Sequence, residues 1–330
     1  GVSFMPETEE KVRQAARKLG YHKPEKNSKK LETTLSGTIL LLAPLLSNSY
    51  YPSIIHSITD QAFRYGYDVI TAVTFRDPDR EEEYLSFAES SKLAGIIILY
   101  PISRITRANS LSRQVPIVLV GEKPDKTRFD SVELDSKKPG YLMSDHLLSL
   151  GHRRIAFITS PIRKQEISRA RRLEGMRIAF IEAGLEENLI EVFQPGRAEY
   201  ESYDRQSVEY QVGYHMAQKA LAASPNLTAF VGQNDTTAYG IMAALRESGF
   251  RIPRDCSVGG FDDSPISAMP QISLTTVEHA AIHKGKDAVD LIYSRNQKDA
   301  GDDTHSRIIR MEYEPRLIIR NSTGPVRIKI

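Results

Sequence analysis

Apolar strands and amphipathic helices alternate in the first half of the chain. Continuous apolar runs predict buried strands, and apolar side chains repeating roughly every three to four residues predict helices. In the helix expected at residues 52–65, Ile54, Ile58 and Ala62 share one face. The other elements expected here are strands at 38–43, 68–73, 95–99 and 117–120 and helices at 79–92 and 105–113. Buried strands separated by helices indicate a parallel sheet covered on both faces.

The same alternation starts again near residue 141. The elements expected in this second series are helices at 141–150, 169–183, 207–222 and 236–248 and strands at 154–159, 190–193, 228–233 and 256–261. A further helix at 283–293 and strands at 308–313 and 317–319 follow. We therefore predict an α/β fold of two similar parallel-sheet lobes, with the natural ligand site in a cleft between them. A short basic helix at 7–20 and a polar segment at 21–35 precede the lobes.

Composition agrees with a globular protein of about two domains. The chain has 330 residues, of which 40% are hydrophobic and 26% charged. Its longest apolar runs, such as 38–46, fall far short of the roughly 20 residues that a membrane span needs, and the N-terminus has no signal-peptide pattern. Cys256 is the only cysteine, so no internal disulfide can form. We therefore expect a cytoplasmic protein without a membrane partner.

Positive charge is concentrated near the N-terminus. The net charge is only +2, but residues 11–30 contain eight lysines or arginines and one acid, Glu25. Such asymmetry favours contact with a polyanion at this end of the chain. The alternative that charge alone leaves open is a solvated basic tail.

Polar side chains follow two apolar strands of the second series. Asn234 comes directly after the strand expected at 228–233, and Asp262 directly after the one expected at 256–261. Ligands of open α/β sheets bind beyond the carboxyl ends of the strands. These two side chains are therefore predicted to form the polar floor of a small-molecule cleft. The alternatives are structural: Asn234 as the N-cap of the next helix, and Asp262 as a turn residue.

Common motifs for catalysis and for cofactor or metal binding are absent from the sequence. It contains no G-x-x-x-x-G-K-[ST], G-x-G-x-x-G, H-E-x-x-H or G-x-S-x-G pattern. The eight histidines are scattered, and one cysteine cannot build a structural zinc site. We therefore expect no catalytic residue, no metal ion and no cofactor, and an enzyme has no positive support.

Several segments together carry a family resemblance. They are VSFMPETEEKVRQAARKLGY (2–21), NSYY (48–51), RDPDREEEYL (76–85), LAGIIIL (93–99), PIVLVGE (116–122), HLLSLGHRRIAFI (146–158), RRLEGMRIAF (171–180), NDTTAYGIMAALRESGFRIPRDCSVGGFDDS (234–264), ISLTTVEH (272–279) and EPRLIIRNST (314–323). In this order and spacing, the chain resembles the LacI/GalR (lac repressor/galactose repressor) family of bacterial transcriptional regulators. The resemblance implies an effector-responsive DNA-binding regulator, most often a repressor.

The resemblance also implies a division of the chain. Family members have a DNA-binding head, a hinge helix and a two-lobed core of the periplasmic-binding-protein-like type I kind, and they usually work as homodimers. The helix after His279 is expected to return to the first lobe. We assign the chain to a head remnant with hinge at 1–35, a first lobe at 36–147 and 281–306, a second lobe at 148–278 and 307–323, and a tail at 324–330.

The N-terminal segment departs from the family pattern. The two helices of a helix-turn-helix should precede Val2, and residues 2–21 resemble only the loop and last helix of the head. We therefore expect a truncation or a late-assigned start, with operator DNA as the partner of the full-length protein. The expected DNA-facing hinge residues are Lys26, Lys29, Lys30 and Leu31. Leu31 is the candidate minor-groove wedge, or alternatively an apolar contact between hinge helices.

Two charged residues are implied as effector contacts by the resemblance. Arg172, in the segment RLEG, matches an arginine whose planar guanidinium can grip two sugar oxygens or a carboxylate. The alternative is a surface ion pair with Glu174 or Glu166. Asp262 matches the first acid of the family's G-[YF]-D-D, and its carboxylate can accept hydrogen bonds from two hydroxyls. Asp263 is the better candidate for a structural acid.

Aromatic and polar side chains complete the expected effector site. Tyr50 and Tyr51 stand where the family often has two phenylalanines, and their rings can cover a sugar face or stack on a base. The alternative is that one of them belongs to the core. Asn234 offers both a donor and an acceptor. Asp135 matches the acid of a D-N segment, and His279 comes just after LTTV, where it is either a ligand contact or a satisfied polar residue.

These groups predict a small carbohydrate-type effector, neutral or mildly acidic, with a purine or a sugar phosphate left open. Binding would favour one angle between the lobes and so set the spacing of two hinge segments in a homodimer. The main alternative is a transporter-type sugar-binding protein without DNA function. It would need a signal peptide and no basic segment at 7–35. The scaffold alone does not exclude an enzyme.

Overall fold

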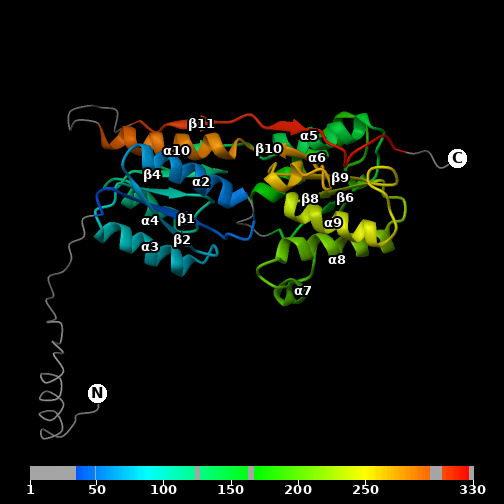
Figure 1. The fold of residues 1–330 in the computed structure, drawn as a ribbon, viewed down its shortest axis with the longest axis horizontal. Coiled ribbons are helices and arrows are strands. Elements are labelled where there is room, and N and C mark those ends of the chain that lie inside the picture. The colour runs from blue at the N-terminus through cyan, green and yellow to red at the C-terminus, as the bar shows by residue number, and fades with distance from the viewer. Residues whose placement is uncertain (1–34, 49, 123–126, 163–166, 298–306, 327–330) are drawn as a thin grey trace, which may run out of the picture. The chain divides into compact units, whose positions relative to one another are not determined.

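The computed structural model describes residues 35–48, 50–122, 127–162, 167–297 and 307–326. These residues form two α/β lobes, each built on a six-stranded sheet (Figure 1). The prediction of two similar lobes with parallel sheets is confirmed. The helix expected at 7–20 and the hinge residues Lys26, Lys29, Lys30 and Leu31 lie outside the described residues.

The first lobe has helices on both faces of a fully parallel sheet. Its strands are β1 (Thr38–Ala43), β2 (Asp68–Val73), β3 (Gly95–Ile98), β4 (Ile117–Gly121), β5 (Asp130–Glu133) and β11 (Arg310–Glu312), and its helices are α2 (Tyr50–Arg64), α3 (Pro78–Ser90), α4 (Ile105–Leu111) and α10 (Ala281–Asn296). The strand order is β11-β5-β4-β3-β1-β2. Because successive residues of a strand point to opposite faces, Ile39 and Leu41 pack with α2 and α10, whereas Leu40 and Leu42 pack with α3 and α4.

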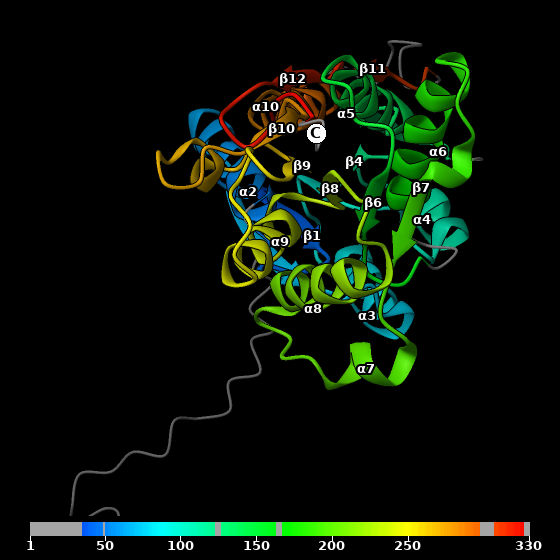
Figure 2. The ribbon, with the colours of Figure 1, turned by 90° about the vertical axis from the view of Figure 1, so that its right-hand side faces the viewer.

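The second lobe repeats this arrangement. Its strands are β6 (Ile155–Ile158), β7 (Ile190–Phe193), β8 (Ala229–Gly232), β9 (Ser257–Phe261), β10 (Thr275–Glu278) and β12 (Arg316–Ile318), and its helices are α5 (Lys137–Ser149), α6 (Ile167–Glu182), α7 (Arg197–Ser202), α8 (Val208–Ala223) and α9 (Asp235–Glu247). The order is β12-β10-β9-β8-β6-β7, and only β12 pairs antiparallel, with β10. Figure 2 shows α5 and α6 on one side of this sheet and α8 and α9 on the other. Helices α8 and α9 pack over one apolar core and helices α5 and α6 over another, on opposite faces of the sheet.

The chain crosses between the lobes in a different place from the predicted one. Helix α5 packs along α6 and against β10 and β12, so residues 137–147 belong to the second lobe, not the first. Strand β11 pairs with β5, so residues 310–312 belong to the first lobe, not the second. Amphipathic patterns show that an element has an apolar face but not which of two similar sheets it covers. Helix α10 returns to the first lobe and packs on α2, as expected.

Three short elements lack an apolar pattern and were not expected from the sequence: β5, β10 and α7. Strand β5 reads Asp-Ser-Val-Glu, and Ser131 is fully buried beside β4 and β11. Its polar side chains are held by specific partners, such as the bidentate ion pair of Asp130 with Arg295 at 2.8 and 2.7 Å. Burial supported by hydrogen bonds leaves no hydrophobic signature in the sequence.

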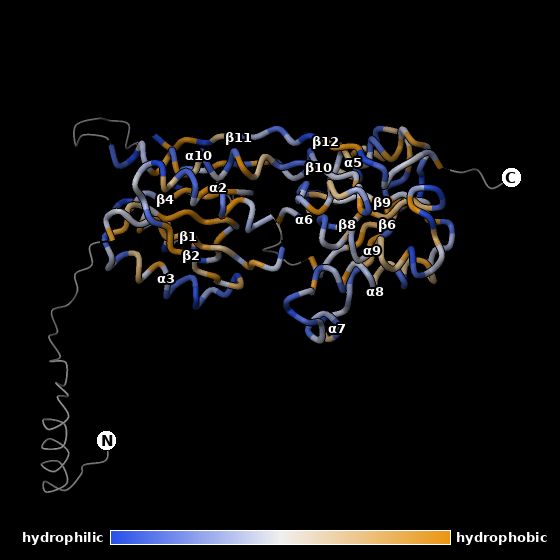
Figure 3. The backbone as a smooth tube through the Cα atoms, viewed as in Figure 1, coloured by the Kyte–Doolittle hydropathy of each residue, from blue (hydrophilic) through white to orange (hydrophobic). Residues whose placement is uncertain are grey.

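Figure 3 shows the apolar residues concentrated in the strands of both lobes, with polar residues on the outer turns of the helices. Within the described ranges, no helix is long and apolar enough to cross a membrane. The same residues contain no group of three His, Cys, Asp or Glu side chains that could hold a metal ion.

Candidate ligand-binding site

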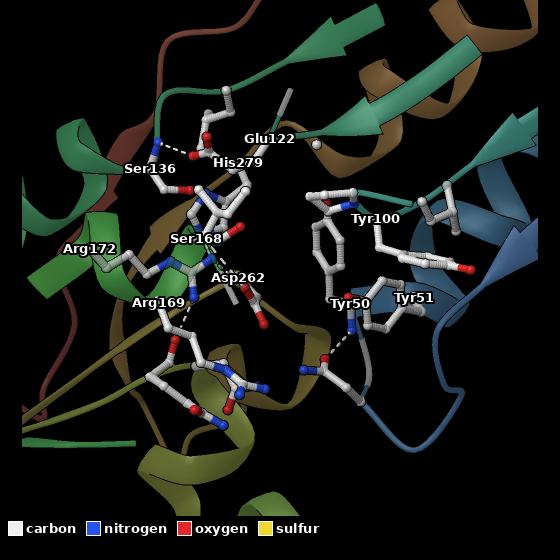
Figure 4. Close-up of a pocket in the computed structure, with 18 of the residues that line it drawn as sticks. Tyr50, Tyr51, Tyr100, Glu122, Ser136, Ser168, Arg169, Arg172, Asp262 and His279 are labelled. Carbon is white, nitrogen blue, oxygen red and sulfur yellow. Dashed lines mark hydrogen bonds and ion pairs between the residues drawn. The ribbon is translucent and has the colours of Figure 1, made fainter. Parts of the chain in front are cut away.

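A cavity of about 860 Å³, open to solvent, lies between the two lobes. The start of α2 supplies Tyr50 and Tyr51, and the carboxyl ends of β8 and β9 lead into Asn234 and Asp262. Six of the seven predicted effector residues line this cavity, namely Tyr50, Tyr51, Arg172, Asn234, Asp262 and His279. Figure 4 shows the tyrosines on the side of the cavity opposite Arg172.

Close packing of α5 on α6 positions the backbone of Arg172. A Cβ atom at Gly140 would lie 1.9 Å from the Arg172 carbonyl oxygen, and one at Gly175 would lie 1.9 Å from the Lys137 carbonyl oxygen. Both distances are far below van der Waals contact, so only glycine permits this approach of the two helices. The result is a rigid base for a long side chain that reaches into the cavity.

The Arg172 guanidinium is the centre of the polar wall. Its Nη1 donates to the carbonyl oxygen of Gln233, and its Nη2 lies 3.6 Å from Asp262 Oδ1. The guanidinium also lies over the ring of Phe261, 4.9 Å from the centroid. The Arg172 Nε is buried and has no hydrogen-bond partner among the described residues. Because Glu174 pairs instead with Lys137 at 2.6 Å, the alternative of an Arg172–Glu174 surface pair does not hold.

Asp262 and His279 face each other beside Arg172. The His279 Nε2 lies 3.5 Å from Asp262 Oδ1 and 3.3 Å from Arg172 Nη2. Burial lowers the pKa of His279 well below its ordinary value, with Arg172 and Lys284 adding to the effect, so the ring is neutral. Burial also raises the pKa of Asp262 well above its ordinary value, although the Arg172 charge opposes this. The His279 Nδ1 is buried without a partner among the described residues.

The backbone at Asp262 is held in an unusual conformation. Its φ angle is 118°, in the region that favours glycine, and Asp263 follows with a φ of 48°. The Asp262 N–H donates to the Val277 carbonyl at 3.0 Å, and Arg320 binds the Asp263 carboxylate at 2.6 Å. Asp263 is therefore structural, as expected. These contacts offset the strain that directs the Asp262 carboxylate into the cavity.

Tyr50 and Tyr51 form an aromatic wall on the first lobe. Their rings meet edge to face, with centroids 5.3 Å apart, and Tyr50 also meets the His279 ring at 6.4 Å. The Tyr50 hydroxyl accepts a hydrogen bond from Lys284 Nζ at 3.4 Å, and the Tyr51 hydroxyl accepts one from Arg76 at 3.4 Å. Both rings also pack against the core below them. The core and cavity interpretations of these residues therefore both apply.

Asn234 has the structural role that the sequence left open. Its Oδ1 accepts from the Thr237 N–H at 2.9 Å, which caps helix α9. The amide nitrogen is left as a donor at the cavity. The next residue, Asp235, escaped the sequence analysis; it is 1% exposed and accepts hydrogen bonds from Ser267 at 2.6 Å and from the Ser264 N–H at 2.8 Å. Burial raises the pKa of Asp235 to about 6.

Asp135 is the predicted effector residue that the structure does not bring to the cavity. Its Oδ1 instead accepts from the Lys137 N–H at 3.0 Å at the start of α5. The buried acid at the cavity here is Glu122, from the end of β4. It accepts from the Ser136 N–H at 2.6 Å and from Arg171 at 3.0 Å. The segment match pointed to the loop after β5, whereas this carboxylate of the cavity follows β4.

The cavity residues that the sequence analysis missed include Asn48, Glu209 and Lys284. Asn48, in the first lobe, donates at 3.0 Å to Glu209 of α8 in the second lobe, and both are buried. Their partnership joins residues 161 positions apart, so no local pattern shows it. Lys284 did leave a signal, because it interrupts the apolar face of its helix four residues before Ala288.

The fold that carries this cavity matches a known protein family. Residues 144–323 match the family model of the periplasmic binding protein-like domain. The chain belongs to the periplasmic binding protein-like family. The predicted resemblance to LacI/GalR regulators is confirmed by relatives and structural neighbours of that kind.

Two curated relatives of this periplasmic binding protein-like chain are named as repressors. The HTH-type transcriptional repressor PurR of Haemophilus influenzae is 29% identical over 324 residues, which cover 97% of this chain and 91% of the relative. The arabinose metabolism transcriptional repressor of Halalkalibacterium halodurans is 29% identical over 295 residues, 87% of this chain and 75% of the relative. A LacI family transcriptional regulator from Enterococcus faecium, solved with bound ribose, has a TM-score of 0.74, 23% identity and coverage of 88% of this chain and 100% of that one. These relatives support a regulator and not an enzyme.

Proposed function

We propose that this protein is an effector-responsive transcriptional repressor of the cytoplasm whose interlobe cavity binds a small carbohydrate-type ligand. The observation that carries the proposal is the pairing, across one cavity, of the tyrosine wall with the Arg172–Asp262 pair. Aromatic rings suit the C–H face of a sugar, and a guanidinium beside a carboxylate suits adjacent hydroxyls. Relatives named as repressors, and a neighbour of the same fold with bound ribose, agree with it.

The ligand would act by favouring one arrangement of the lobes. Its contacts come from both lobes, as does the hydrogen bond of Asn48 with Glu209 at 3.0 Å. A ligand that binds one lobe angle better than another shifts the population toward that angle. In a homodimer this angle would set the spacing of the hinge residues Lys26, Lys29, Lys30 and Leu31, and so their fit to operator DNA.

Exposed apolar side chains on the first lobe support the homodimer. Phe63 of α2 is 82% exposed, and Ile70 of the edge strand β2 is 41% exposed. Large apolar side chains on an unpaired edge favour contact with a second copy. Sedimentation should show a dimer that Phe63→Glu dissociates, while Arg64→Glu on the same helix leaves it intact. If the wild-type protein sediments as a monomer, the homodimer is excluded from the proposed mechanism.

Thermal-shift titration against neutral sugars, sugar acids, sugar phosphates and purines tests the binding site. A ligand that binds only the folded state raises the melting temperature with ln(1 + [L]/Kd). Arg172→Met and Asp262→Asn should each weaken a hit by roughly 10- to 100-fold, because each removes a charge-assisted hydrogen bond. Arg177→Met, on α6 but away from the cavity, is the matched control. A hit indifferent to both cavity variants would refute this site.

Operator release tests the regulatory half of the proposal. The full-length protein should bind its operator with an affinity that changes when the effector from the titration is added. A transporter-type sugar-binding protein would bind the same ligands without any effect on DNA binding, and that result would favour this alternative.

A further inference from the structure

Lys284 is a buried cation in the wall of the cavity. It lies in the first turn of α10, is 2% exposed, and lines the cavity beside Tyr50. Its Nζ has one weak polar contact, with the Tyr50 hydroxyl at 3.4 Å, and lies 5.8 Å from the centre of that ring. Among the described residues it forms no ion pair with a carboxylate. Lysine is almost never fully buried without such a partner, because the ammonium loses its hydration.

The acids around Lys284 are already bound to other groups. Asp262 lies 3.6 Å from Arg172 Nη2 and 3.5 Å from His279 Nε2. Glu278 accepts from the Ala280 N–H at 2.7 Å and pairs with Arg316 at 3.2 Å.

Glu122 and Glu209 also have partners other than Lys284, a cation for Glu122 and a neutral amide for Glu209. Glu122 is held by the Ser136 N–H at 2.6 Å and by Arg171 at 3.0 Å, and Glu209 by Asn48 at 3.0 Å. The Lys284 ammonium therefore has no carboxylate of the described residues in direct contact, and Asp262, Glu278 and Glu122 act on its charge only from farther away.

We propose that the effector carries a carboxylate, as a sugar acid does, and that this group binds Lys284 Nζ and the Tyr50 hydroxyl. This inference rests on the proposed function and names the class of ligand for the same cavity. Two donors side by side match the two oxygens of a carboxylate, and a single ammonium balances its single negative charge. The sugar hydroxyls then face Arg172, Asp262 and the amide nitrogen of Asn234.

Calorimetric titration with matched ligands tests the inference. Each set contains a neutral sugar, its acid and its phosphate ester, for example galactose, galacturonate and galactose 1-phosphate, with equivalent sets built on glucose, arabinose and ribose. We expect at least one acid to bind wild type at least about 10-fold tighter than its neutral partner. Lys284→Met should abolish this preference, a loss of roughly 10- to 100-fold for the acid, with little change for the neutral sugar.

Two further variants keep the result interpretable. Lys286→Met removes a lysine from the same helix, outside the cavity, and should leave the preference unchanged. Lys284→Gln keeps a polar donor but no charge, and should behave like Lys284→Met even if methionine disturbs packing.

Each other outcome overturns the inference in its own way. Neutral sugars that bind as well as their acids would refute the carboxylate and leave the proposed function standing. Tighter binding of the phosphate esters would replace the carboxylate by a phosphate. Acid binding that survives Lys284→Met would place the acid elsewhere. Absence of binding by every ligand of the panel would overturn the proposed function as well.

Discussion

Replacing Lys284 by methionine should stabilise the ligand-free protein at pH 7. Burial lowers the pKa of Lys284 from 10.5 to about 8, and the neighbouring Arg172 adds to the effect. At about 1.4 kcal/mol for each pKa unit, holding the ammonium in the folded state costs about 3 kcal/mol below pH 8. Methionine has a similar length and no charge. Loss of the weak Tyr50 contact offsets roughly 1 kcal/mol of the gain, so we expect the free energy of unfolding to rise by about 2 kcal/mol.

The same reasoning fixes how this gain depends on pH. The folded protein releases the Lys284 proton near pH 8, whereas the unfolded chain keeps it up to its ordinary pKa of 10.5. Between these values the unfolded state binds more protons, so the free energy of unfolding of the wild type rises with pH. The difference in free energy of unfolding between Lys284→Met and the wild type should therefore fall by about 2 kcal/mol between pH 7 and pH 9.5. In the wild type, the pKa of Lys284 is also lowered by Arg172 and raised by Asp262, Glu278 and Glu122. None of these four residues changes in the variant.

Urea unfolding followed by circular dichroism at pH 7 and pH 9.5 measures both effects. Lys286→Met provides the control for losing a lysine from the same helix, and it should show no comparable gain. A wild type more stable than Lys284→Met at pH 7, or a difference between them that does not change with pH, would refute the reasoning. Either result would mean that the ammonium is solvated or paired in the folded protein.

Other predictions concern the residues that shape the cavity. Asn234→Ala should lower the free energy of unfolding by about 1 kcal/mol through loss of the α9 N-cap, and Asn234→Asp should restore it; melting of the ligand-free protein checks this. Gly140→Ala should cost at least about 1–3 kcal/mol, because the new methyl meets the Arg172 carbonyl oxygen; a stability equal to wild type in urea unfolding would contradict the packing described. Glu209→Ala should free the lobes from the Asn48 hydrogen bond and enlarge the radius of gyration in small-angle scattering, whereas Glu209→Gln keeps an acceptor and should not.

Much of the fold could be predicted because most strands are buried on both faces. A strand such as β1 has to be apolar along its whole length, so its bounds at 38–43 were predicted without error. The cavity floor was also predictable, since Asn234 and Asp262 follow strands whose carboxyl ends meet at one edge. Strand β5 was not, because its polar residues are buried with hydrogen-bond and ion-pair partners distant in sequence, such as Arg295 for Asp130.

The sequence by itself determined the two α/β lobes, the family resemblance and six of the side chains that meet at the cavity. Periodicity and motif spacing are local properties of the chain, so they can be recognised from the sequence without the structure. Only the tertiary structure decided that Glu122 and not Asp135 faces the cavity, and that Asn48 binds Glu209 across the lobes. It also decided that no carboxylate of the described residues contacts Lys284. Whether a charge is paired depends on every group within a few ångströms, and folding brings those groups together from distant parts of the chain.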